Sequence, residues 1–115
     1  MIKAGQIVTF RFPQTDLAAG KLRPALLIGK VPDYFNNWLI CMITSKLKYQ
    51  IVDFDEIISP TDADFVPSGL KTASLIRIGR LAVADVFLLK GYLGEIDAQR
   101  LNRIKEKLSH WLMTS

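Results

Sequence analysis

An apolar run of strand length, Pro24 to Val31, limits the possible folds of this chain more than any other feature. Its centre, Ala25 to Ile28, contains no polar residue. A continuous apolar run of this length is typical of a strand that is buried on both faces, whereas a half-exposed strand alternates apolar and polar residues. The run therefore predicts a central strand in a sheet with material packed on both sides.

Further strands are predicted on either side of this run, from alternating or apolar segments that end at turn residues. They are residues 6–12, 38–44, 53–58 and 74–81, with loops at 14–22 and 59–69. In the first of them, Val8, Phe10 and Phe12 share one face. Residues 82–93 fit either a short helix or another strand.

A C-terminal helix is predicted to begin after Asp97, a favourable N-cap residue, with Ile96 positioned to pack against Leu101. Apolar residues then recur at helical spacing, and these are Leu101, Ile104, Leu108, Trp111 and Leu112. The opposite face carries Arg100, Arg103, Lys107 and His110, which we expect in solvent. The helix is thus amphipathic and should pack on the sheet.

The predicted elements and the length of 115 residues fit a single domain over residues 1–115. Half of the residues are hydrophobic, which is enough for a real core. The expected fold class is mostly β (α+β), with five or six strands in a small twisted or barrel-like antiparallel sheet and a C-terminal amphipathic helix. No repeat or linker interrupts it.

The charge of +4 is unevenly distributed along the chain. Residues 1–50 carry seven basic and two acidic side chains, and residues 71–115 carry eight and four. Residues 51–70 carry five acids and no base. The basic parts suggest a polyanionic partner, although an ordinary solvated surface also explains them. The acidic stretch is expected to be a solvated edge or loop that lies away from such a partner.

Several classes of site are excluded by the motifs. The chain has no glycine-rich phosphate loop, no dinucleotide fingerprint, no Cys/His cluster and no His-Glu-x-x-His motif. We therefore expect no metal and no cofactor. The single histidine, His110, is expected on the surface, and the single cysteine, Cys41, as a small buried hydrophobe. No signal peptide and no membrane-spanning apolar stretch are visible, so a cytoplasmic protein is expected.

Candidate anion-binding side chains lie at strand ends and in one strand interior. Arg23 stands where a flexible loop meets the central strand, and Arg77 interrupts the apolar strand 74–81. A guanidinium binds phosphate oxygens bidentately and stays charged at any working pH. Thr44, Ser45 and Lys46 end the strand 38–44 with two hydroxyls and a cation. From spacing alone, all of these also fit ordinary surface positions.

Taken together, these segments resemble the MazF/PemK family of toxin endoribonucleases. The resemblance rests on Lys21-Leu22-Arg23-Pro24-Ala25-Leu26-Leu27-Ile28, on Met42-Ile43-Thr44-Ser45-Lys46, on the opening Ala4-Gly5-Gln6-Ile7-Val8, and on the block from Ser74 to Asp85. It covers nearly the whole chain. The motifs are short, and their order and spacing carry the match.

The resemblance implies an SH3-like β-barrel with helices, a homodimer, and metal-independent cleavage of single-stranded RNA at a short sequence. It also implies an antitoxin partner whose tail occupies the RNA groove. Arg23 matches the family's catalytic arginine and Thr44 its catalytic hydroxyl residue, while Arg77 matches an arginine with a catalytic role in the PemK-like branch. An acidic residue and a glutamine are common where this chain has Gly79 and Arg80.

For RNA cleavage, we expect Arg23 to neutralise charge that develops on phosphorus and Thr44 to orient the reacting phosphate. Lys21, Ser45 and Lys46 are expected to bind substrate, and Phe12 could stack a base or belong to the core. We expect Lys21, Arg23, Lys46 and Arg77 to converge on one RNA groove. The alternatives are a CcdB-like toxin with a protein target and a nucleic-acid-binding regulator without turnover.

Overall fold

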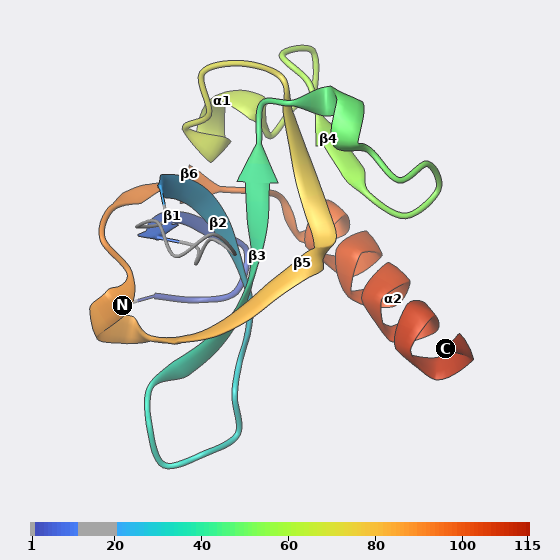
Figure 1. Cartoon of the computed structure of the whole chain (residues 1–115). Helices are drawn as coiled ribbons and strands as arrows, with labels where there is room; N and C mark the ends of the chain where they lie inside the picture. The colour runs from blue at the N-terminus through green and yellow to red at the C-terminus, as the bar shows by residue number, and fades with distance from the viewer. Residues whose placement is uncertain (1, 12–20) are drawn as a thin grey trace.

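Six antiparallel strands form a strongly curved sheet in the computed structural model, which describes residues 2–11 and 21–115 (Figure 1). The strand order in the sheet is β4-β5-β3-β2-β1-β6. The strands are β1 (Gln6–Arg11), β2 (Leu22–Lys30), β3 (Asn37–Thr44), β4 (Glu56–Ile58), β5 (Ser74–Asp85) and β6 (Tyr92–Glu95). The helices are the short η1 (Leu47–Tyr49), α1 (Phe65–Ser68) and η2 (Val86–Leu88), and the long α2 (Ala98–Thr114). The expected fold class is confirmed: a mostly β half-barrel with a C-terminal helix.

The predicted central strand is β2, which lies between β3 and β1 in the middle of the sheet. Leu26 and Ile28 point into the core between the sheet and α2, while Ala25 and Leu27 point into a second core on the other face. All four side chains are buried. The run is therefore apolar because its side chains are buried on both faces of the sheet, as the sequence predicts.

Each face of the sheet has its own apolar cluster. The cluster under α2 includes Ile104 and Leu108 of the helix and fully buried strand residues, among them Ile7, Leu26, Cys41, Ile43, Ile76 and Ile78. The cluster on the other face includes Val8, Phe10, Ala25, Leu27, Trp38, Ile40, Met42 and Ala84. Val8 and Phe10 share a face as expected, and Phe12 lies outside the described residues.

Among the described helices, none is long and apolar enough to cross a bilayer.

The helix α2 begins where the sequence predicts it. Asp97 is its N-cap, and its side chain accepts a hydrogen bond from the Arg100 backbone N–H at 2.7 Å. Ile104 and Leu108 are buried, but the apolar face does not continue to the C-terminus: Trp111 is 39% exposed and Leu112 is 59% exposed. The expectation that the apolar face of the helix packs on the sheet is therefore wrong for Trp111 and Leu112.

Strand β5 is longer than the predicted strand and contains an irregularity. It runs on to Asp85 because it pairs along the whole of β3. Residues 82–93, for which the sequence allowed either a helix or a strand, form the end of β5, then η2, and then the start of β6. The pairing changes from Cys41↔Leu81 to Met42↔Arg77, so residues 78–80 of β5 lie between these two pairs as a bulge.

The acidic loop before β4 holds this bulge in place. Asp55 is buried, and its carboxylate accepts a hydrogen bond from the backbone N–H of Ile78 at 3.1 Å and another from that of Ile51 at 2.8 Å. The predicted strand 53–58 is shortened to Glu56–Ile58 because the residues before it form this turn, in which Asp53 adopts a left-handed conformation with φ 65°. Asp55 is thus a structural residue and is not solvated.

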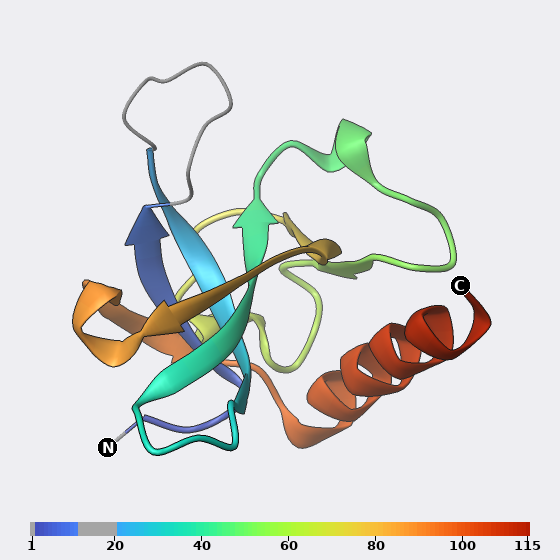
Figure 2. The ribbon, with the colours of Figure 1, turned by 60° about the horizontal axis from the view of Figure 1, so that its bottom comes forward.

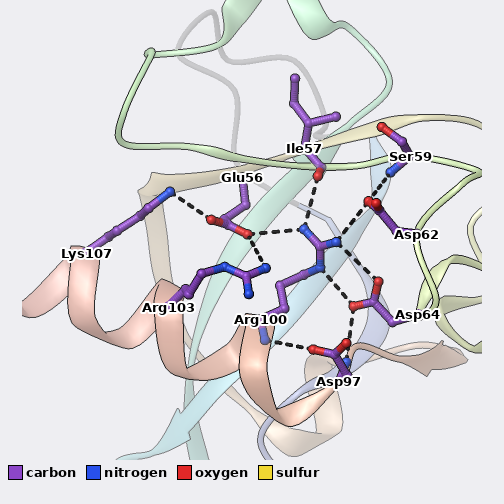
Figure 3. Close-up of polar contacts among 9 residues, drawn as sticks. All are labelled: Glu56, Ile57, Ser59, Asp62, Asp64, Asp97, Arg100, Arg103 and Lys107. Atoms are coloured by element: carbon purple, nitrogen blue, oxygen red, sulfur yellow. Dashed lines mark hydrogen bonds and ion pairs between the residues drawn. The ribbon is translucent and has the colours of Figure 1, made fainter.

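Arg100 ties the acidic stretch to α2, and the expectation that Arg100 faces solvent is wrong (Figure 3). Its side chain is only 7% exposed. A guanidinium has five N–H donors, and all five are used here. The acceptors are both carboxylate oxygens of Asp64, one oxygen each of Glu56 and Asp62, and the carbonyl of Ile57, at 2.8–3.2 Å.

Arg103 and Lys107 also pair with Glu56 and complete this cluster. We call the cluster the Arg100 clamp, and it consists of Arg100, Arg103, Lys107, Glu56, Asp62 and Asp64. The Lys107 Nζ lies 2.8 Å from Glu56 Oε2, and the Arg103 guanidinium 3.2 Å from Glu56 Oε1. The acids were expected to be a solvated edge or loop, but three of the five are paired with cations of α2. Charge of opposite sign on distant segments therefore joins the loop to the helix.

The clamp shifts the acidity of its carboxyl groups. Burial by itself raises the pKa of Glu56, but hydrogen bonds from Lys107 and Arg103 and their charges outweigh it, so the pKa lies below its ordinary value. Burial also raises the pKa of Asp64. The hydrogen bonds from Arg100 and from the Asp97 backbone have the larger effect, so this pKa too lies below its ordinary value. Burial by itself lowers the pKa of Arg100, but its hydrogen bonds to Asp64 and the nearby negative charges outweigh burial, so the pKa lies above its ordinary value.

These shifts predict acid-sensitive folding. A carboxyl whose folded pKa is depressed stabilises the fold above its unfolded pKa, and the contribution is lost as the pH falls through the folded pKa. The free energy of unfolding is therefore expected to be level from about pH 7 to about pH 5 and to fall below about pH 4. Urea denaturation followed by circular dichroism measures this. The Glu56→Gln variant should show a smaller acid-dependent fall, and an equal fall in both proteins would contradict the assignment.

Candidate functional site

A pocket of about 320 Å³ brings together three of the residues singled out from the sequence: Arg23, Thr44 and Ser45. Arg23 lies near the start of β2, and Thr44 is the last residue of β3. The two strands pair antiparallel with Ala25 opposite Met42, so the same register continued by two residues places Arg23 across from Thr44. The antiparallel geometry of the sheet therefore explains why residues from two separate motifs meet.

Another wall of the pocket comes from the loop between α1 and β5 and from the first residue of β5. This wall contains Lys71, Thr72 and Ser74, and the Ser74 hydroxyl donates a hydrogen bond to the Thr72 carbonyl at 2.9 Å. Nothing in the local sequence marks Lys71 or Thr72 as site residues, because they reach the pocket only through packing between distant segments. They are the members of the site that sequence reasoning missed.

Two glycines fix this wall against β6. Gly69 has a φ of 73°, and a Cβ atom there would lie 2.0 Å from the Leu93 carbonyl oxygen. A Cβ atom on Gly94 would lie 2.1 Å from the Pro67 carbonyl oxygen. Side chains at either position would collide with backbone, so only glycine allows α1 to rest directly on β6. This close approach holds the start of the loop that carries Lys71 against β6.

The pocket is cationic and offers hydrogen-bond donors. Within residues 2–11 and 21–115, neither Arg23 nor Lys71 forms an ion pair with a carboxylate. Thr44 is largely buried, and its hydroxyl oxygen accepts a hydrogen bond from the Lys46 backbone N–H at 3.2 Å. This leaves the Thr44 O–H to donate to a ligand. Such an arrangement suits an anion with several oxygens, such as a phosphodiester.

The other predicted site residues do not line this pocket. Lys21 and Lys46 are exposed, and each directly adjoins a pocket-lining residue in the sequence. Phe12 lies outside the described residues. Arg77 lines a separate pocket, and its guanidinium lies over the ring of Tyr49 at 5.1 Å from the centroid. Of the four cations that we expect to converge on one groove, Arg23 lines this pocket, whereas Lys21, Lys46 and Arg77 do not.

The reactive side chains elsewhere in the described chain take no part in this pocket. His110 is exposed on α2, as expected. Cys41 is fully buried in the core, and burial strongly raises the pKa of its thiol, so the reactive thiolate is disfavoured. In residues 2–11 and 21–115, no group of three or more His, Cys, Asp or Glu side chains is arranged to hold a metal ion. The clustered acids surround Arg100 instead.

Comparison with known proteins places the chain in a family. The family model described as "PemK-like, MazF-like toxin of type II toxin-antitoxin system" matches residues 3–112. One similar solved structure is an endoribonuclease in complex with its cognate antitoxin from a mycobacterial species, with a TM-score of 0.67 and 16% sequence identity. The match covers 100% of this chain and 98% of that chain, and it shows a shared fold. A search of curated protein sequences finds no match. Because the family model spans nearly the whole sequence, this chain belongs to the PemK-like, MazF-like toxins of type II toxin–antitoxin systems.

Proposed function

We propose that this protein is a toxin endoribonuclease that cleaves single-stranded RNA at short sequence motifs without a metal ion. The observation that carries the proposal is the pocket that Arg23, Thr44, Ser45 and Lys71 line together. Two cations and several hydroxyls around one cavity fit a phosphodiester. The membership of the toxin family favours RNA over other phosphodiester substrates.

The proposed reaction is an internal transesterification. The ribose 2′-oxygen bonds to the adjacent phosphorus and loses its proton, the bond from phosphorus to the 5′-oxygen breaks, and the 5′-oxygen gains a proton. The products are a 2′,3′-cyclic phosphate and a 5′-hydroxyl. Negative charge develops on the non-bridging oxygens, so fixed positive charge and hydrogen-bond donors lower the barrier.

Arg23 and Thr44 have the chemistry for this task. The Arg23 guanidinium would pair with the phosphorane oxygens, and the Thr44 O–H would donate to one of them and hold the phosphate in line with the 2′-oxygen. Ser45 and Lys71 would bind the same phosphate or its neighbours, and Lys21 and Lys46 would bind RNA just outside the pocket. The described lining has no carboxylate, imidazole or thiolate, the groups that bind catalytic metal ions, which supports a metal-independent reaction.

The family also suggests the partners. We propose a cytoplasmic homodimer that is held inactive by a cognate antitoxin and that inhibits growth when the antitoxin is lost. An antitoxin segment with acidic side chains would compete with RNA for Arg23 and Lys71. Several large apolar side chains are exposed, including Val83, Phe87 and Leu88, and such surfaces are typical of proteins that bind other proteins.

The test is to incubate the purified protein with a long single-stranded RNA in buffer that contains EDTA. Discrete fragments are expected, because cleavage at short motifs gives defined products and needs no metal. RNA that is bound but remains intact would favour the nucleic-acid-binding regulator. RNA that is neither bound nor cut would favour a toxin with a protein target.

A further inference from the structure

The cleavage reaction needs a proton for the departing 5′-oxygen, and one side chain in the pocket of Arg23 and Thr44 is suited to supply it. We propose that Lys71 is the general acid: its ammonium group protonates the 5′-oxygen as the bond from phosphorus to this oxygen breaks. This role rests on the proposed function, because it assigns one step of that reaction. It goes beyond phosphate binding, because the ammonium then acts on a reacting atom.

The departing 5′-oxygen is the part of the reaction that Arg23 and Thr44 do not serve. Both residues are assigned to the non-bridging oxygens of the phosphate, where negative charge develops. Negative charge develops on the departing oxygen too, unless a proton reaches it as the bond breaks. A positioned general acid typically accelerates such a step by about 100- to 10,000-fold. Cleavage is therefore faster if the pocket also holds a proton donor.

The lining of the pocket offers one side chain of the kind that transfers protons. General acids and bases in proteins are histidine, glutamate, aspartate, lysine, tyrosine and cysteine. Among the described residues that line this pocket, Lys71 is the one that belongs to this group. An arginine such as Arg23 keeps its proton at any working pH. The remaining polar lining consists of hydroxyls, which donate hydrogen bonds without giving up the proton.

The loop that carries Lys71 is anchored on both sides of this residue. On one side, the Leu70 backbone N–H donates a hydrogen bond to the hydroxyl oxygen of Ser68 at 3.2 Å, and Ser68 is fully buried. On the other side, the buried Ser74 donates its hydrogen bond to the Thr72 carbonyl. The backbone at Lys71 is therefore held in place, and the side chain starts from a defined position at the pocket.

The same loop brings Lys71 to the end of β3. Strand β5 begins at Ser74, three residues after Lys71, and its second residue, Leu75, pairs with Thr44. Figure 2 shows the loop, in yellow, passing beside the end of β3. A lysine ammonium stands on a flexible four-carbon stem. It can therefore follow the departing oxygen while Arg23 and Thr44 hold the phosphate.

The Lys71 ammonium is not engaged by a carboxylate in the part of the chain that the structure describes. Lys71 is exposed, and none of the ion pairs among residues 2–11 and 21–115 includes it. An ammonium has three N–H donors. One of them can reach the departing oxygen while another binds a phosphate oxygen, so proton donation and phosphate binding are compatible.

The step balances with water as the co-reactant. The 2′-oxygen bonds to phosphorus and gives its proton to a water molecule. The bond from phosphorus to the 5′-oxygen breaks, and its electron pair passes to the 5′-oxygen. An N–H bond of the Lys71 ammonium breaks at the same time, and this proton joins the 5′-oxygen. The neutral amine then takes up a proton from the solvent, which restores the starting state.

The test compares two substrates: an RNA with one mapped cleavage site, and the same RNA with sulfur in place of the bridging 5′-oxygen at that site. A thiolate is a stable anion near neutral pH and needs no proton to leave. On the ordinary RNA, Lys71→Ala is expected to lower kcat about 100-fold. On the sulfur-substituted RNA, Lys71→Ala and the wild type should cleave at nearly equal rates, because the leaving group no longer needs an acid.

Lys71→Arg separates proton donation from charge. A guanidinium keeps the positive charge but does not release its proton, so this variant should be almost as slow as Lys71→Ala on the ordinary RNA and should be rescued by sulfur as well. If Lys71 only binds phosphate or supports the loop, Lys71→Arg keeps most of the activity, and the loss in Lys71→Ala is the same on both substrates. Either result would overturn the assignment.

Two controls complete the experiment. Arg23→Ala should be slow on both substrates, because charge develops on the phosphorane whichever atom leaves. Lys105→Ala removes the same charge as Lys71→Ala from an exposed position on α2, and it should cleave both substrates at the wild-type rate. Wild-type cleavage of the ordinary RNA by Lys71→Ala refutes only the role of Lys71. A wild type that cleaves neither substrate refutes the proposed function, and the role of Lys71 with it.

Discussion

Replacing Arg23 with alanine is expected to slow RNA cleavage by about 100- to 1,000-fold, the usual effect of removing one group that stabilises transition-state charge. In the proposed reaction this guanidinium is the fixed positive charge nearest to the phosphorane on the β2 side of the pocket. Lys71, which also lines the pocket, cannot replace its bidentate geometry. The rate should be measured on an RNA with one mapped cleavage site.

Arg23→Ala has a matched control on the same strand. Lys30 is exposed at the other end of β2, where it donates a hydrogen bond to the Phe35 carbonyl. Lys30→Ala removes the same charge and should cleave at the wild-type rate. Arg23→Lys should fall between the wild type and Arg23→Ala, because it keeps the charge and loses the bidentate donor pair. A wild-type rate for a folded Arg23→Ala would refute the role of this residue.

Replacing Arg100 with alanine is expected to lower the free energy of unfolding by about 3–5 kcal/mol, the typical cost of removing one partner from a buried ion pair. The variant removes all five hydrogen bonds that Arg100 supplies, three of which go to the buried carboxylates of Glu56 and Asp64. Domains of this size are stable by about 5–15 kcal/mol in total. Urea denaturation should therefore show a protein that is close to unfolding.

Arg103→Ala is the control for this effect. Arg103 lies one turn further along α2 and also bonds to Glu56, but its side chain is 50% exposed and makes one hydrogen bond in the clamp. Exposed ion pairs contribute about 0–1 kcal/mol, so this variant should be nearly as stable as the wild type. Equal losses for Arg100→Ala and Arg103→Ala would show that Arg100 has no special structural role.

The clamp also bears on the candidate active site. Asp64 is the residue directly before α1, and the wall that carries Lys71 and Thr72 follows α1. Asp64 accepts hydrogen bonds from Arg100 and from the Asp97 backbone, and Gly69 rests against Leu93. One side of the pocket is therefore positioned by charge pairing with α2 and by close backbone packing on β6.

The features that the sequence predicts correctly are those with a local cause. Burial on both sides produces the apolar run of β2, and capping by Asp97 starts α2. The meeting of Arg23 and Thr44 follows from two motifs at the ends of neighbouring antiparallel strands. Knowledge of the family fold was needed to place those strands side by side, because no spacing in the chain gives the strand order.

The features that the sequence misses depend on contacts between distant segments. A charged residue on a helix is normally solvated, and only the acids of the 56–64 segment make burial of Arg100 favourable. The bulge at residues 78–80 depends on Asp55, and Lys71 reaches the pocket through the packing of Gly69 on Leu93. Trp111 fits a helical apolar stripe, but it contacts Phe54 of the loop before β4 and remains 39% exposed.

The central claim is that the ribose 2′-hydroxyl is the nucleophile in a pocket that contains Arg23 and Thr44. It is tested most directly by analysing the ends of RNA fragments produced in EDTA. The account predicts 2′,3′-cyclic phosphates and 5′-hydroxyls, and it predicts that an RNA with a single 2′-deoxynucleotide on the 5′ side of the mapped site stays intact there. Fragments with 5′-phosphates, or cutting of the deoxy-substituted RNA at that site, would contradict it.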